Sequence, residues 1–174
     1  MTGWLKSSLY IGAALVLTTG VVAWSDDDDD RVDLSARLIG FQEVPSVSSV
    51  ARGEFKGRLT RDGLAYTLRY SGLEANVLFA HIHFGQEGVN GGVMTFLCGG
   101  GSKPDPCPQS GVVRGFIDMD DITGSTGSTN QGIAPGEFRE FVRAIRGGKS
   151  YANVHSVKFP GGEIRGQIKV DDDD

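Results

Sequence analysis

Apolar and polar side chains alternate over short stretches of this chain, and glycine-rich segments separate the stretches. A two-residue period places one set of side chains on each face of a β-strand. The alternation is clear in residues 53–61 and 64–70, and Asp62 and Gly63 between them form a typical hairpin turn. The pattern therefore restricts the chain to a fold built from short antiparallel strands.

Further segments show strand patterns of the same kind. Strands are predicted at residues 34–41, 53–61, 64–70, 77–84, 92–97, 112–117, 151–157 and 163–170. Phe138, Phe141, Val142 and Ile145 instead follow helical spacing, and glycines at 147 and 148 end that segment. The 26 glycines suit tight turns and bulges. We expect an all-β fold, an antiparallel Greek-key-like β-sandwich with one short helix.

The N-terminal segment resembles a targeting signal. Lys6 precedes an apolar run at residues 9–22, and small residues follow up to Ala23. This predicts a signal peptide at residues 1–23 and a secreted or periplasmic protein. The run is short compared with the ~20 residues of a membrane span, so no stable span is expected after cleavage. A retained N-terminal anchor is the alternative.

Runs of aspartate flank the predicted domain. Residues 24–33 are expected to form an acidic disordered segment, residues 34–170 the β-sandwich domain, and residues 171–174 an acidic tail. These runs supply nine of the acidic groups behind the net charge of −5. No cluster of lysine or arginine indicates nucleic acid binding. The sequence also contains no nucleophile elbow and no phosphate-binding loop.

Cys98 and Cys107 are the two cysteines, and they flank a loop rich in glycine and proline. In an exported chain such a pair is expected to form a disulfide. Binding of a metal by the two thiolates is less favoured, because thiolates are oxidised in that compartment. This inference depends on export.

Three histidines occur in the chain: His81, His83 and His155. His81 and His83 are two positions apart on a predicted strand, so they point to one side, roughly 6.5–7 Å apart along the backbone. His155 lies on another predicted strand and could complete a three-nitrogen site. Such a site suits copper, favoured by the affinity order, with zinc as the alternative. Histidines that only pack and hydrogen-bond, without a metal, are the structural alternative.

Glu163 and Arg165 alternate onto one face of the last predicted strand. They are candidates for side chains that orient the histidines from outside the ligand set. The alternation itself favours a solvent-exposed or salt-bridged face. Glu43 permits the same two interpretations.

Several short motifs occur in an order that resembles the chordin-type (CHRD) domain family. They are residues 38–45 (LIGFQEVP), 64–68 (LAYTL), 80–85 (AHIHFG), 90–93 (NGGV), the cysteine loop, 151–155 (YANVH) and 159–167 (FPGGEIRGQ). The resemblance covers about residues 34–170. It implies an extracellular β-rich domain, found in animal chordin, which binds growth factors, and in bacterial secreted proteins with no settled activity.

Residues 80–85 are also similar to the strand of copper–zinc superoxide dismutases that carries two copper-binding histidines. This chain departs from that pattern, because it has no fourth histidine for copper and none to bridge copper to zinc. We therefore expect a secreted or periplasmic domain that binds copper through His81, His83 and His155. The alternatives are a metal-free extracellular binding or adhesion module and a copper-dependent oxidoreductase.

Overall fold

The computed structural model describes residues 1, 31–126 and 131–171 of the chain. The predicted signal peptide beyond Met1 and the run Asp26–Asp30 lie outside the described residues, as do residues 172–174 of the acidic tail. β1 begins at Val32, so Val32 and Asp33 belong to the sheet rather than to the acidic segment expected at residues 24–33. No helix in the described ranges is long and apolar enough to cross a membrane.

The described residues form strands with one short α-helix. In chain order the elements are β1 (Val32–Ile39), η2 (Gly40–Gln42), β2 (Arg52–Leu59), β3 (Leu64–Ser71), β4 (Val77–Phe84), β5 (Gly92–Cys98), β6 (Gly111–Ile117), η3 (Met119–Asp121), α1 (Phe138–Arg146), β7 (Ser150–Ser156), β8 (Ile164–Gln167) and β9 (Lys169–Val170). The all-β class and the single short helix are confirmed.

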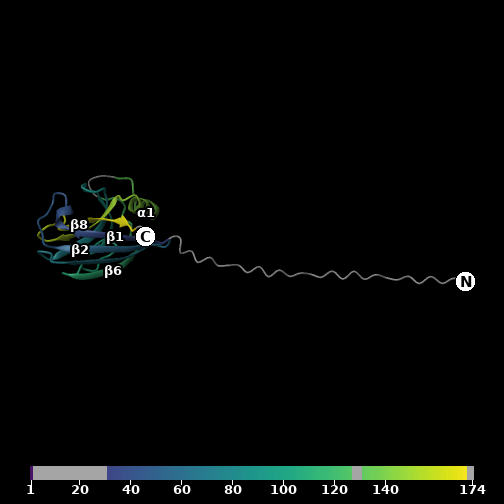
Figure 1. Cartoon of the computed structure of the whole chain (residues 1–174), viewed down its shortest axis with the longest axis horizontal. Helices are drawn as coiled ribbons and strands as arrows, with labels where there is room; N and C mark the ends of the chain where they lie inside the picture. Colours follow the sequence, from purple (N-terminus) through teal and green to yellow (C-terminus); the bar gives the residue numbers. More distant parts are fainter. Residues whose placement is uncertain (2–30, 127–130, 172–174) are drawn as a thin grey trace.

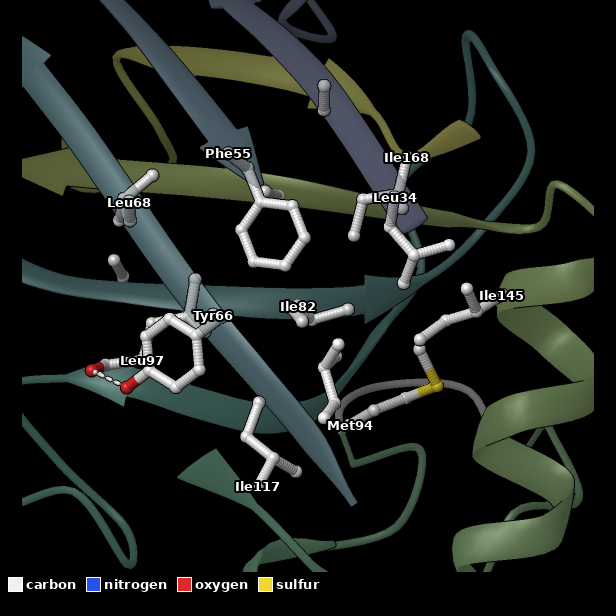
Figure 2. Packing of buried hydrophobic residues seen from close by; sticks show 14 of the residues in the cluster. Leu34, Phe55, Tyr66, Leu68, Ile82, Met94, Leu97, Ile117, Ile145 and Ile168 are labelled. Carbon is white, nitrogen blue, oxygen red and sulfur yellow. Dashed lines mark hydrogen bonds between the residues drawn. The ribbon is translucent and has the colours of Figure 1, made fainter. Parts of the chain in front are cut away.

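The strands make one nine-stranded sheet in the order β5-β4-β7-β8-β1-β2-β3-β6, with β9 paired to β1. All the pairings are antiparallel. The sheet curls until its end strands β5 and β6 contact each other, which gives a nearly closed, barrel-like sheet. Tyr66 on β3 donates a hydrogen bond of 2.7 Å to the Leu97 carbonyl on β5, across this closure (Figure 2).

The core fills the space inside the curled sheet. Side chains from distant strands, including Phe55, Ile82 and Met94, point into this interior (Figure 2). Helix α1 lies at one end of the sheet (Figure 1) and buries Phe141 and Ile145, which carry the apolar stripe predicted from the sequence. Burying such a stripe removes apolar surface from water, which is the main stabilising term for a helix of this length.

The prediction of one continuous strand over residues 163–170 is wrong. The strand breaks at Ile168, so that β8 pairs with β7 and β1, whereas β9 pairs only with β1. Ile168 is fully buried in the core, and its backbone N–H donates to the Ser150 carbonyl. Ile168 is buried like Ile164, so the break lies in the pairing of the backbone and not in the facing of the side chains.

Cys98 at the end of β5 forms a disulfide with Cys107, with a sulfur–sulfur distance of 1.96 Å. The loop that it closes is also tied down by Lys103, whose ammonium lies 2.6 Å from the Asp121 carboxylate. The predicted pairing of the two cysteines is present in the structure.

Replacing both cysteines, Cys98→Ala with Cys107→Ala, should lower the free energy of unfolding by about 2–3 kcal/mol, because the short cross-link no longer restricts the unfolded chain. Urea unfolding followed by circular dichroism would measure the loss. The oxidised wild type treated with a reductant should lose the same amount. An unchanged midpoint in both samples would contradict the prediction.

Candidate metal centre

Strands β4 and β7 carry the three histidines. Their antiparallel register pairs Phe79 with His155, His81 with Asn153, and His83 with Tyr151. Because side chains alternate along a strand, these six residues share the outer face of the sheet, while Ala80 and Ile82 point into the core and are fully buried. The register therefore brings the three imidazoles together as predicted.

The three rings surround a common point. One ligand nitrogen from each ring can be chosen so that all three lie within 4.8 Å of one another. The ring centroids are 5.3 Å apart for His81 and His83, 4.9 Å for His81 and His155, and 6.1 Å for His83 and His155. Three bonds of ~2.0–2.1 Å to one ion would place the nitrogens about 3.3–3.6 Å apart. Closing the set requires a movement of about 1 Å, which side-chain torsions can supply.

Two of the imidazoles are oriented by backbone carbonyls. His83 Nδ1 lies 3.0 Å from the Gly91 carbonyl oxygen, and His155 Nδ1 lies 3.0 Å from that of Pro160. A carbonyl can only accept, so each Nδ1 carries the proton and each neutral ring keeps its lone pair on Nε2. Both Nε2 atoms are buried without a hydrogen-bond partner, as are both ring nitrogens of His81. A histidine that ligates a metal commonly shows this arrangement, with the second nitrogen tied to a carbonyl.

Burial keeps the three rings neutral. Burial, together with the smaller effects of the neighbouring His155 and His83, lowers the pKa of His81 from 6.5 to about 2. Burial also lowers the pKa of His83 and of His155 to about 4, although the carbonyls of Gly91 and Pro160 oppose the shift. At neutral pH the site therefore offers uncharged imidazoles, the form that binds metals.

Aromatic rings enclose the histidines. Phe79 stacks on His81 at a centroid distance of 4.7 Å and contacts His155 at the same distance. Phe96 meets His81 edge-on at 4.3 Å, and Tyr151 stacks on His83 at 4.6 Å with nearly parallel planes. These apolar walls restrict the rotation of the rings and exclude water from their nitrogens.

The expectation that Glu163 and Arg165 form a solvent-exposed face is wrong. Arg165 is 2% exposed and Glu163 is fully buried. The Arg165 guanidinium lies 3.4 Å from the centre of the Tyr151 ring and donates hydrogen bonds to the Asn90 side chain and to the Gln86 and Val89 carbonyls. Segments that follow β1 and β4 thus cover the outer face, which the alternation of polar residues could not reveal.

Arg165 acts on the site indirectly. It stacks on the face of Tyr151 and Tyr151 stacks on His83, so the three side chains form one column. The Tyr151 hydroxyl accepts a hydrogen bond from the Gly91 N–H, and the Gly91 carbonyl accepts one from His83. This column holds the ring of His83 in place. Arg165 therefore reaches His83 only through an intervening ring, and its role in orienting a histidine stays a prediction.

Glu163 serves a different purpose. Its carboxylate accepts hydrogen bonds from the Ser49 and Ser156 hydroxyls and from the Glu74 N–H. These bonds attach the loops of Ser49 and Glu74 to the ends of β7 and β8, and they involve no imidazole. Glu163 thus lies on the same strand segment as Arg165, but its carboxylate contacts no histidine.

Glu43 and Asn153 form a buried polar pair beside the site. The Asn153 amide nitrogen donates a hydrogen bond of 2.6 Å to Glu43 Oε1 and a second hydrogen bond to the Ile164 carbonyl. Burial raises the pKa of Glu43 to about 7, against the opposing effects of Arg165 and Asn153. Gly162 has a φ of +127°, and a Cβ there would lie 2.6 Å from Glu43 Oε1. Only a glycine fits this position.

Sequence reasoning missed several residues of the site. Tyr151 and Asn153 could have been found, because they alternate with His155 along one strand. Phe79 precedes His81 by two positions and could have been found in the same way. The Gly91 and Pro160 carbonyls and Phe96 come from loops and from another strand, and nothing in one sequence indicates their contacts.

A family model described as the CHRD domain matches residues 34–168 of the chain. The match spans most of the chain and the described sheet from β1 to Ile168. No curated protein and no solved structure matches. The comparisons therefore support the chordin-type resemblance and do not show the local similarity to copper–zinc superoxide dismutases.

Lowering the pH in the presence of EDTA should destabilise the protein through the three histidines. An unfolded imidazole takes up a proton near pH 6.5, whereas His83 and His155 do so only near 4. The unfolded chain therefore binds more protons in this window, and stability is lost as the pH falls from 6.5 towards 4. The loss should be on the order of 2 kcal/mol per histidine between about pH 8 and pH 5.

Glu43 has the opposite sign, because its pKa is raised and its contribution is lost as the pH rises from 4.5 through about 7. Comparing wild type with His83→Gln cancels this contribution, since both proteins retain Glu43. Urea unfolding at a series of pH values should show a shallower acid dependence in the variant. Parallel curves for the two proteins would refute the assignment.

Proposed function

We propose that this chain, which belongs to the CHRD domain family, binds one transition-metal ion through His81, His83 and His155, and that the ion is copper in preference to zinc. The observation that carries the proposal is the set of buried ring nitrogens that have no hydrogen-bond partner and lie within reach of one ion. The family assignment by itself specifies no ligand.

The energetics of these nitrogens support metal binding. A buried polar atom without a partner costs about 1–3 kcal/mol, and most such atoms in folded proteins are satisfied. Here one strand pair concentrates them around one point, with aromatic rings as their other neighbours. An ion that accepts three lone pairs would remove this cost for three of the four nitrogens, leaving the second ring nitrogen of His81 without a partner. A purely structural role for the histidines leaves it uncompensated.

The donor set favours copper. Three imidazole nitrogens suit copper and zinc, and copper binds such sites more tightly in the general affinity order. The nitrogens are sealed from solvent, whereas catalytic metal sites keep an accessible coordination position. This burial favours a protein that holds or delivers the metal over one that turns over a substrate. A metal carrier is therefore a better-supported function than an oxidoreductase.

We propose further that the protein acts outside the cytoplasm, secreted or in a periplasm. The disulfide supports this location, because such bonds persist in oxidising compartments. The apolar N-terminal run and the family membership agree with it. A copper-holding domain at this location would sequester the metal or pass it to a partner.

Full-length protein purified without an affinity tag should bind close to one equivalent of copper, as measured by mass spectrometry of metals after dialysis. His155→Ala should weaken the affinity by more than about 100-fold, because losing a ligand should exceed the 10–100-fold effect of outer contacts. Bound metal should also stabilise the wild type by about 2.7 kcal/mol at a free concentration of 100 times the Kd.

Tyr66→Phe provides a matched control. It removes a buried hydrogen bond in the core, so it should reduce stability while leaving copper stoichiometry unchanged. A wild-type affinity weaker than about 1 μM for both copper and zinc would overturn the proposal and favour a metal-free binding or adhesion module.

A further inference from the structure

We infer that the three-histidine site selects monovalent copper, Cu(I), over both Cu(II) and Zn(II). The inference rests on the proposed function, because it specifies which ion the same site holds. It is carried by the number and charge of the ligands and by the aromatic enclosure around them. Each of these features favours the monovalent ion for a separate physical reason.

The first argument is geometric. Cu(II) prefers tetragonal sites with nitrogen and oxygen ligands, which need a fourth group in the plane. Among the described residues, the cluster that could hold an ion here consists of the three histidines alone, with no carboxylate and no thiolate. Cys98 and Cys107 are joined in the disulfide and lie outside this cluster. Three nitrogens around one point suit a three-coordinate ion, and Cu(I) accepts that number readily.

The second argument is electrostatic. All three ligands are neutral, so the ion's own charge is not compensated by its ligands. Arg165 lies 3.4 Å from the centre of the Tyr151 ring, and Tyr151 stacks on His83 at 4.6 Å, so only one aromatic ring separates this positive charge from an imidazole of the site. The field of this charge opposes a bound cation in proportion to the cation's charge. A divalent ion therefore meets twice the repulsion that a monovalent ion meets.

The third argument is the cost of desolvation. Each Nε2 atom is buried, and Phe79, Phe96 and Tyr151 surround the imidazoles. The penalty for moving an ion from water into such surroundings rises with the square of its charge, so a divalent ion pays about four times the monovalent penalty. Zn(II) with three histidines normally retains a water as its fourth ligand. The aromatic walls disfavour that water.

The test compares three ions on the full-length protein without an affinity tag. Cu(I) is titrated without oxygen in competition with bicinchoninate, and Cu(II) and Zn(II) are titrated in competition with nitrilotriacetate. We expect the Kd for Cu(I) to be about 1,000-fold below that for Cu(II). For a one-electron couple this ratio raises the potential of the bound copper by about 180 mV relative to aqueous copper. X-ray absorption should show three nitrogen ligands around Cu(I).

A ratio below tenfold, or tighter binding of Zn(II) than of Cu(I), overturns this inference while the proposed metal function stands. Failure of all three ions to bind overturns the proposed function itself. The two failures are therefore distinguishable in one set of titrations.

A pair of variants tests the electrostatic cause. Phe96 is only partly buried and its ring lies 4.3 Å from that of His81, so a polar side chain at this position can be tolerated. Phe96→Asp introduces a carboxylate beside the site, and Phe96→Asn introduces a neutral group of the same shape. The aspartate variant should reduce the Cu(I)-to-Cu(II) preference at least tenfold relative to the asparagine variant. Equal preferences in the two variants would overturn the electrostatic argument, and the wild-type ratio remains decisive if either variant fails to fold.

Discussion

The antiparallel pairing of β4 with β7 is the constraint on which the other features depend. Its register places Ala80, Ile82 and their partners in the core and places all three histidines on the opposite face. A shift by one residue would exchange the two faces, exposing the apolar set and burying the imidazoles in the aliphatic core. The packing of the core therefore fixes the positions of the three histidines, which the sheet beneath them holds in place.

The outer face of this strand pair is dry, which is unusual for a sheet whose other face forms the core. Arg165 and Glu163 explain how this is achieved, because each is a buried charged group that binds loop backbone or loop side chains. The loop that Arg165 binds leads into Gly91, whose carbonyl orients His83. The loop between β7 and β8 supplies the Pro160 carbonyl that orients His155. Because these buried charged groups bind the loops, the outer face is covered by a polar layer instead of water. The low dielectric of that layer keeps the imidazoles neutral.

Much of this arrangement could be predicted from the sequence, because an alternation with a period of two residues indicates both where a strand lies and which side chains share one face. It located β4 at residues 77–84 without error and placed His81 and His83 on one side. The same rule failed at Arg165, because alternation reports which residues share a face and says nothing about what covers that face. His155 joins the other two histidines only because β7 pairs with β4, and these strands are far apart in the sequence. A single sequence gives the residue types of the two strands but not the register in which they pair.

The unpartnered nitrogens connect the stability of the apo protein with the proposed function. A site that holds neutral imidazoles without hydrogen-bond partners is less stable than an apolar cluster of the same shape would be, by the desolvation cost of each nitrogen. Folding of the sheet offsets this cost, because β7 is buried along its whole length and Tyr66 links β3 to β5 where the sheet closes. If the site holds an ion as proposed, binding of that ion would remove most of this cost. The feature that weakens the metal-free fold would then also favour the bound metal.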